Sequence, residues 1–274
     1  MGEAVVVARI LTIVLVAIVA AYLFATYIRR TGMFFPEKYP EGMWETGRYA
    51  IAPQDVIITS RDGTKLHGWL IRSPKPGAPL MVFFHGNAGN LTERAPVSVE
   101  LAQRGVSVLL FDWRGYGKSE GTPSESRLYD DALAAYDFAA KLNPDIVVYG
   151  ESLGAPFSAW VAKHRRVRCA IVDSSFPSLM AMGNAHYFPL GYFVPRAMRT
   201  ADWLNDAGVP VLVMHGKKDD VAPFQLGVKL FQALRVPKEM LVSERAGHCE
   251  IEAVEPERYY AAVTGFTVRW CATK

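Results

Sequence analysis

Short, continuous apolar runs alternate with helical patterns along most of the chain. The runs are three to six residues long, carry no charge, and lie at residues 80–84, 106–111, 146–149, 169–172, 209–214 and 240–242. Continuous rather than alternating runs predict strands that are buried on both faces of a parallel sheet. Helices are expected between and after them, at residues 92–103, 124–142, 152–164, 224–234 and 256–269. The alternation predicts a doubly wound α/β fold with a mostly parallel sheet.

Two more segments extend this sheet, and one segment interrupts the alternation of strands and helices. Residues 56–59 and 66–71 are predicted to be strands around a turn at residues 61–63, which brings the expected sheet to about eight strands. Residues 174–204 are rich in Phe, Tyr, Met and Pro and are longer than an ordinary connection. We expect a short cap insertion there, above the carboxyl-terminal edge of the sheet, where open α/β folds bind ligands.

The N-terminal segment has a different pattern. No residue from Ile10 to Ile28 is charged, and a helix of these 19 residues would be roughly 28 Å long, close to the ~30 Å hydrocarbon core of a bilayer. Tyr22 and Tyr27 lie towards the end of this stretch, and Arg29 and Arg30 follow it. Aromatic residues followed by arginine are typical of a membrane interface.

We therefore expect residues 1–30 to be a single-pass membrane anchor, residues 31–53 a linker that packs onto the domain, and residues 54–274 the α/β domain itself. A cleaved signal peptide is an alternative, with residues 19–21 as a poor cleavage site. A buried soluble helix is a third interpretation, although such helices are usually amphipathic. The segment after the stretch carries two more Lys and Arg residues than the segment before it. This excess favours a cytoplasmic position for the domain.

Composition narrows the functional classes. The chain has 274 residues, half of them hydrophobic, which suits one α/β domain and an appendage. The net charge is +3 and basic runs are short, so nucleic-acid binding has little support. The three cysteines, Cys169, Cys249 and Cys271, form no metal-ligand pattern and suggest no disulfide framework. We interpret Cys169 as a core residue and Cys249 as structural.

A G-x-S-x-G pentapeptide, Gly150–Gly154, follows the apolar run at residues 146–149. A strand that enters such a pentapeptide and then a helix forms the nucleophile elbow of serine hydrolases, with Ser152 at its apex. The turn is tight, and a Cβ at either flanking glycine would collide with neighbouring backbone. Because Gly and Ser are common, the pentapeptide alone is a weak signal.

A serine nucleophile needs a base, and the base needs an orienting acid. On this fold the chain order is serine, acid, histidine. Of six histidines, only His248 follows every candidate acid loop, so we predict it as the base. Asp219, after the run at residues 209–214, is the predicted acid; Asp220 is the second candidate and Asp173, at the end of an earlier strand, the third.

The oxyanion of the tetrahedral intermediate needs two donors that are placed in advance. One is expected to be the backbone N–H of Leu153, which lies at a helix N-terminus, where negative charge is favoured. The other is expected from the loop His85–Asn90, and the backbone N–H of Asn87 is the best candidate. His85 is expected to hold that loop rather than to act as a base.

From about residue 50 to its end, the chain resembles the α/β-hydrolase fold. More closely, it is similar to a membrane-anchored subgroup that includes monoacylglycerol and lysophospholipid lipases and protein depalmitoylases. The matching stretches are His85–Asn90, Asp112–Gly121 with Pro123–Glu125, Gly150–Gly154, and His215–Gly216 with Asp219. The weakest match is Gly247–Glu250, because family members more often have Asn after the histidine.

The resemblance implies a membrane-anchored serine hydrolase that cleaves carboxylic esters of lipids or acyl chains through an acyl-enzyme intermediate. It implies no metal and no organic cofactor. An acyl-protein thioesterase or a serine peptidase is the alternative within enzymes. A binding protein that kept the fold without catalysis is the alternative outside them, although an intact Ser, Asp and His in this order argues against it.

Overall fold

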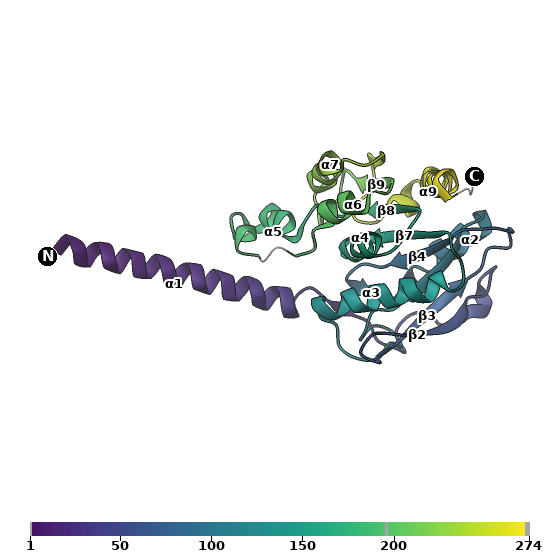
Figure 1. Cartoon of the computed structure of the whole chain (residues 1–274), viewed down its shortest axis with the longest axis horizontal. Coiled ribbons are helices and arrows are strands. Elements are labelled where there is room, and N and C mark those ends of the chain that lie inside the picture. The colour runs from purple at the N-terminus through teal and green to yellow at the C-terminus, as the bar shows by residue number, and fades with distance from the viewer. Residues whose placement is uncertain (1, 195–196, 272–274) are drawn as a thin grey trace.

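The computed structural model describes residues 2–194 and 197–271. Its centre is an eight-stranded sheet in the order β10-β9-β8-β7-β4-β6-β3-β2 (Figure 1). The strands are β2 (Gln54–Thr59), β3 (Lys65–Ile71), β4 (Leu80–Phe84), β6 (Ser107–Phe111), β7 (Ile146–Glu151), β8 (Cys169–Asp173), β9 (Val211–Gly216) and β10 (Lys238–Ser243). Only the β2–β3 and β3–β6 pairs of this sheet are antiparallel, so the predicted mostly parallel sheet is confirmed.

Helices cover both faces of the sheet. One face packs against α3 (Glu125–Ala140), α4 (Gly154–His164), α6 (Thr200–Ala207) and α7 (Phe224–Ala233). The other face packs against α2 (Ala95–Arg104) and α9 (Pro256–Cys271), with the short α8 (Ile251–Val254) before α9. Each layer buries an apolar cluster. The central strands β4, β6, β7, β8 and β9 are apolar along most of their length because both of their faces are covered, whereas the edge strands β2 and β10 carry more polar residues.

The structure differs from the expected elements at several boundaries. Residues 91–93 form a 3₁₀ turn, and α2 begins only at Ala95. The helix after the elbow begins at Gly154 rather than at Ser152, because Ser152 has a left-handed backbone. Helix α6 was not expected. A second, two-stranded sheet was also missed: β1 (Phe35–Pro36) pairs in parallel with β5 (Ala88–Gly89).

The N-terminal helix and the cap project from the same end of the domain (Figure 1). Helix α1 (Gly2–Thr31) is one long helix, and its residues Ala4–Phe24 are long and apolar enough to cross a membrane. After β8 the chain forms α5 (Leu179–Tyr187) and the 3₁₀ turn η3 (Leu190–Phe193), and η3 contacts α1. A further 3₁₀ turn, η1 (Thr46–Arg48), lies between β1 and β2.

Candidate active site

Ser152 lies at the apex of a sharp turn between β7 and α4. Its backbone φ is 49°, a left-handed conformation that non-glycine residues seldom adopt. A Cβ on Gly150 would overlap the backbone of Ala155, and a Cβ on Gly154 would overlap the carbonyl oxygen of Phe84. Glycine is therefore required on both sides of the serine, because strand β4 and helix α4 approach the turn so closely.

The structure brings Ser152, His248 and Asp219 together in one chain of hydrogen bonds. The Nε2 atom of His248 lies 2.9 Å from the Oγ atom of Ser152. The Nδ1 atom of His248 lies 2.8 Å from the Oδ2 atom of Asp219. Asp220 is exposed, and Asp173 is bonded elsewhere. Of the three candidate acids, only Asp219 contacts the imidazole.

The surroundings of Asp219 keep it ionised. Burial raises the pKa of Asp219, but hydrogen bonds from His215 and His248 and from the backbone of Ala222 outweigh burial and lower the pKa to about 2. A carboxylate only accepts hydrogen bonds, so the Nδ1 atom of His248 must carry the proton and donate it. The Nε2 atom is then the free acceptor that faces Ser152.

Asp219 acts in turn on His248. Burial lowers the pKa of His248, but the hydrogen bond and the negative charge of Asp219 outweigh burial and raise the pKa above its ordinary value. The negative charges of the more distant Asp173 and Glu151 also raise the pKa of His248. The imidazole is therefore a stronger proton acceptor than a free histidine.

Two backbone N–H groups border the serine without partners. In the described part of the chain, neither the N–H of Leu153 nor that of Asn87 donates to another protein group. The loop after β4 comes close to the serine: a Cβ built on Gly86 would lie 3.6 Å from the Cβ of Ser152. Both N–H groups are thus without a protein partner among the described residues, and the loop that carries Asn87 comes close to Ser152.

A buried ion pair that the sequence did not predict supports this loop. Glu151, the variable residue before the serine, bonds Arg94 at 2.7 Å and accepts the N–H of Gly86 at 3.2 Å. Burial raises the pKa of Glu151, but Arg94 outweighs burial and lowers it, so the carboxylate stays charged. The sequence contains only one sign of this ion pair: Glu151 is charged, whereas the other four residues of the pentapeptide are uncharged.

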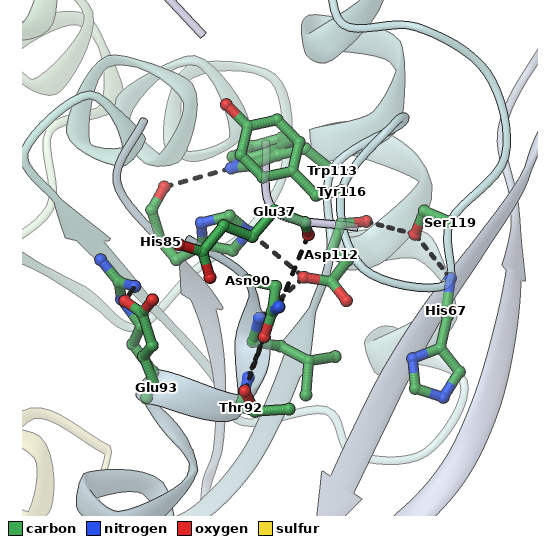
Figure 2. Close-up of polar contacts among 12 residues, drawn as sticks. Glu37, His67, His85, Asn90, Thr92, Glu93, Asp112, Trp113, Tyr116 and Ser119 are labelled. Atoms are coloured by element: carbon green, nitrogen blue, oxygen red, sulfur yellow. Dashed lines mark hydrogen bonds and ion pairs between the residues drawn. The ribbon is translucent and has the colours of Figure 1, made fainter. Parts of the chain in front are cut away.

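The carbonyl group of Asn87 is held from two sides. The hydroxyl of Tyr116 donates to it at 2.7 Å, and the N–H of Phe35 donates at 2.8 Å. Further along the loop, the amide of Asn90 lies between Thr92 and the carbonyl oxygen of Glu37 (Figure 2). The linker after α1 and the loop that carries Tyr116 therefore both hold the segment beside Ser152.

His85 holds the loop. Its Nδ1 atom donates to the carbonyl oxygen of Gly86 at 2.9 Å, in the peptide group whose N–H belongs to Asn87. Burial lowers the pKa of His85 to about 3, so the ring is neutral. Its Nε2 atom faces Asp112 at 3.8 Å (Figure 2), and burial raises the pKa of that carboxyl to about 8.

The third candidate acid has a different position. The carbonyl oxygen of Asp173 accepts the N–H of Ser152 at 2.8 Å, and its carboxylate accepts the hydroxyl of Tyr149 at 2.7 Å. Burial raises the pKa of Asp173 to about 6. Asp173 thus lies beneath the elbow and not against the imidazole. Among the described residues, no three His, Cys, Asp or Glu side chains are placed to hold a metal ion.

Fold and site together define an α/β hydrolase, and known proteins agree. Residues 79–201 match the α/β-hydrolase fold family. The chain is 32% identical over 263 residues to the Mycobacterium tuberculosis protein Rv2307c, covering 93% of each chain. It is 32% identical over 218 residues to YfhR of Salmonella typhimurium, covering 72% of this chain and 75% of that one. The chain belongs to the α/β-hydrolase family.

Two solved structures share the architecture. The esterase Pf2001 of Pyrococcus furiosus superposes with a TM-score of 0.72, covers 87% of this chain and 98% of its own, and is 23% identical. The esterase EaEST of Exiguobacterium antarcticum has a TM-score of 0.61, covers 78% and 99%, and is 17% identical. At these identities the likeness shows a common fold.

Proposed function

We propose that the protein is a serine hydrolase that cleaves carboxylic esters through an acyl-enzyme intermediate. The observation that carries the proposal is the hydrogen-bonded series Ser152–His248–Asp219, with distances of 2.9 and 2.8 Å. A serine hydroxyl is a weak nucleophile until an adjacent base takes its proton, and the base must be held in the right tautomer. The ionised Asp219 holds His248 in that tautomer.

In the first half of the reaction, the Oγ atom of Ser152 attacks the acyl carbon while the Nε2 atom of His248 takes the hydroxyl proton. The carbonyl oxygen becomes an oxyanion, for which the free N–H groups of Asn87 and Leu153 are the proposed donors. His248 then gives its proton to the leaving alcohol, and the carbon–oxygen bond of the ester breaks.

In the second half, water attacks the acyl group on Ser152. His248 accepts a proton from the water, and the second oxyanion occupies the same position as the first. His248 returns the proton to the Oγ atom as the acid leaves. The cycle needs no group beyond the side chains and backbone already named.

Acyl chains of lipids are the substrate class that the rest of the chain favours. The cap is rich in aromatic and aliphatic residues, and the adjacent α1 carries an apolar stretch that is long enough for a membrane. The same chemistry would cleave an acyl-protein thioester or a peptide bond. An ester is preferred to a peptide bond because an alcohol is a better leaving group than an amine. The esterases of similar fold agree with this choice.

The same proposal assigns the parts of the chain. Residues 1–30 are a single-pass anchor, residues 31–53 a linker, and residues 54–274 the catalytic domain, with residues 174–204 as its cap. The excess of Arg and Lys after the span favours the cytoplasmic side for the domain. Protease treatment of sealed cells should leave the domain intact and should digest it only after lysis; digestion in sealed cells would reverse the orientation.

Labelling with a fluorophosphonate probe tests the hydrolase proposal. The folded wild-type protein should be labelled, and the matched variant Ser152→Ala should not. A folded wild type that resists the probe would overturn the proposal. A panel of p-nitrophenyl esters of increasing chain length then tests the substrate class: activity that falls beyond butyrate would exclude a lipid acyl chain.

A further inference from the structure

Exposed apolar side chains gather at the tip of the cap, from Tyr187 to Tyr192. Tyr187 is 69% exposed, Phe188 75% and Tyr192 64%. The rings of Phe188 and Tyr192 contact each other with centroids 6.2 Å apart. No Asp, Glu, Lys or Arg occurs between residues 174 and 194. Single exposed apolar residues are ordinary, whereas a cluster of them marks an interaction surface.

This tip lies beside the end of the apolar stretch of α1 (Figure 1). A cavity of about 490 Å³ lies next to the contact between α1 and η3, and its walls come from both sides. From the α1 side it is lined by Phe24 and Met33, and from the cap by Met182, Leu190 and Val194 among others. The cap tip and the end of α1 therefore share one apolar region.

The position of this region along α1 indicates which part of a bilayer the cap tip would face. Phe24 is the last residue of the candidate membrane span and also lines the cavity. A surface beside Phe24 would lie where hydrocarbon gives way to headgroups, if α1 crosses the bilayer. Tyrosine is enriched at that depth, and exposed Tyr22 and Tyr27 on α1 match it.

We propose that the cap tip, Tyr187–Tyr192, is a second membrane-docking surface that inserts into the lipid leaflet around the C-terminal end of α1. The proposal rests on the proposed anchoring by α1. A lipid leaflet fits better than a protein partner because the tip is uncharged and its apolar surface continues onto α1. An acyl chain in that leaflet can then enter the cavity without crossing water.

The experiment uses the full chain in phosphatidylcholine vesicles with an environment-sensitive NBD label. One variant carries the label at Phe188→Cys. The matched control carries it at Leu142→Cys, which is 40% exposed and precedes β7, at the sheet edge opposite the cap. Both variants also carry Cys249→Ser, because Cys249 is partly exposed whereas Cys169 and Cys271 are buried.

The label at position 188 should emit strongly and should resist quenching by dithionite at least fivefold longer than the label at position 142. Equal, fast quenching of both labels in protein that floats with the vesicles would overturn cap docking while leaving anchoring by α1 intact. Protein that does not float with vesicles would overturn both. Neither readout needs the protein to be a hydrolase, so its activity is judged separately.

A second variant tests the consequence for substrate access. Tyr187→Ser, Phe188→Ser and Tyr192→Ser together remove the apolar tip, and all three side chains are exposed, so the fold should tolerate them. Hydrolysis of a short, water-soluble ester should change less than twofold. Hydrolysis of a long-chain ester embedded in vesicles should fall at least tenfold. An equal rate on the embedded ester would contradict the proposal.

Discussion

The backbone N–H of Phe35 donates to the carbonyl oxygen of Asn87 over 2.8 Å. Phe35 lies four residues beyond the end of α1, and Asn87 lies in the loop beside Ser152. The N–H of Glu37 adds a second bond, to the carbonyl oxygen of Gly89 at 3.1 Å. The linker is thus part of the structure that sets the position of the proposed oxyanion donor.

Removing the Phe35 N–H should therefore impair catalysis. Phe35→Pro deletes this donor, and we expect kcat to fall about tenfold with little change in KM. Complete loss of an oxyanion donor costs about 10²–10³, and Tyr116 still holds Asn87 in the variant, so the loss should be smaller. Steady-state kinetics on a soluble ester measures it.

Phe35→Ala is the matched control, because it keeps the N–H and shortens only a side chain that is 57% exposed. It should retain wild-type kcat. An equal loss of kcat in both variants would show that the side chain matters and not the hydrogen bond. Thermal unfolding of each variant separates a positioning effect from loss of the fold.

Asp219 and its neighbour provide a second matched pair. Asp219→Asn should lower kcat by about 10⁴, because an amide in this position favours the wrong tautomer of His248. Asp220→Asn removes an exposed carboxylate that has no bond to the imidazole and should leave kcat unchanged. The two rate constants, measured on the same ester, decide the assignment. The reverse result would make Asp220 the acid.

The pH dependence of kcat/KM should report His248. The protonated imidazole cannot accept the proton of Ser152, so activity should fall tenfold per pH unit below the pKa of His248. Because Asp219 raises this pKa above its ordinary value, the midpoint should lie above about 6.5. In Asp219→Asn the midpoint should move to lower pH, since the negative charge is gone. A midpoint that stays in place would remove His248 from this role.

Much of this architecture could be predicted from the sequence, because strands buried on both faces leave continuous apolar runs. The chain order of Ser152, Asp219 and His248 likewise selected residues that the structure places within hydrogen-bonding distance. Asp219 and Asp220 both satisfy this order, so the order could not decide between them. That choice depends on which carboxylate turns inwards, and the turn at residues 217–220 determines it.

The supporting contacts could not be predicted, because they join segments that lie far apart in the chain. Arg94 and Glu151 are 57 residues apart, and Tyr116 and Asn87 are 29 apart. Strands β1 and β5 have two residues each, too short for any periodic pattern. Their pairing depends on the path of the linker across the domain, which no local pattern in residues 31–53 indicates.

The buried carboxyl of Asp112 leads to a prediction about stability. Burial raises its pKa to about 8 in the folded protein, whereas an unfolded Asp titrates near 3.9. Between these values the folded state holds a proton that the unfolded chain has lost, so this group makes stability fall as pH rises. Asp112→Asn cannot titrate, and its carbonyl oxygen can still accept the N–H of Leu91.

The decrease in Tm from pH 5 to pH 8 should therefore be smaller in Asp112→Asn than in the wild type by about 5 °C or more. Calorimetry at both pH values measures this difference, with Asp220→Asn, an exposed carboxylate, as the control that should follow the wild type. Parallel Tm curves for Asp112→Asn and the wild type would mean that Asp112 is ionised in the folded protein.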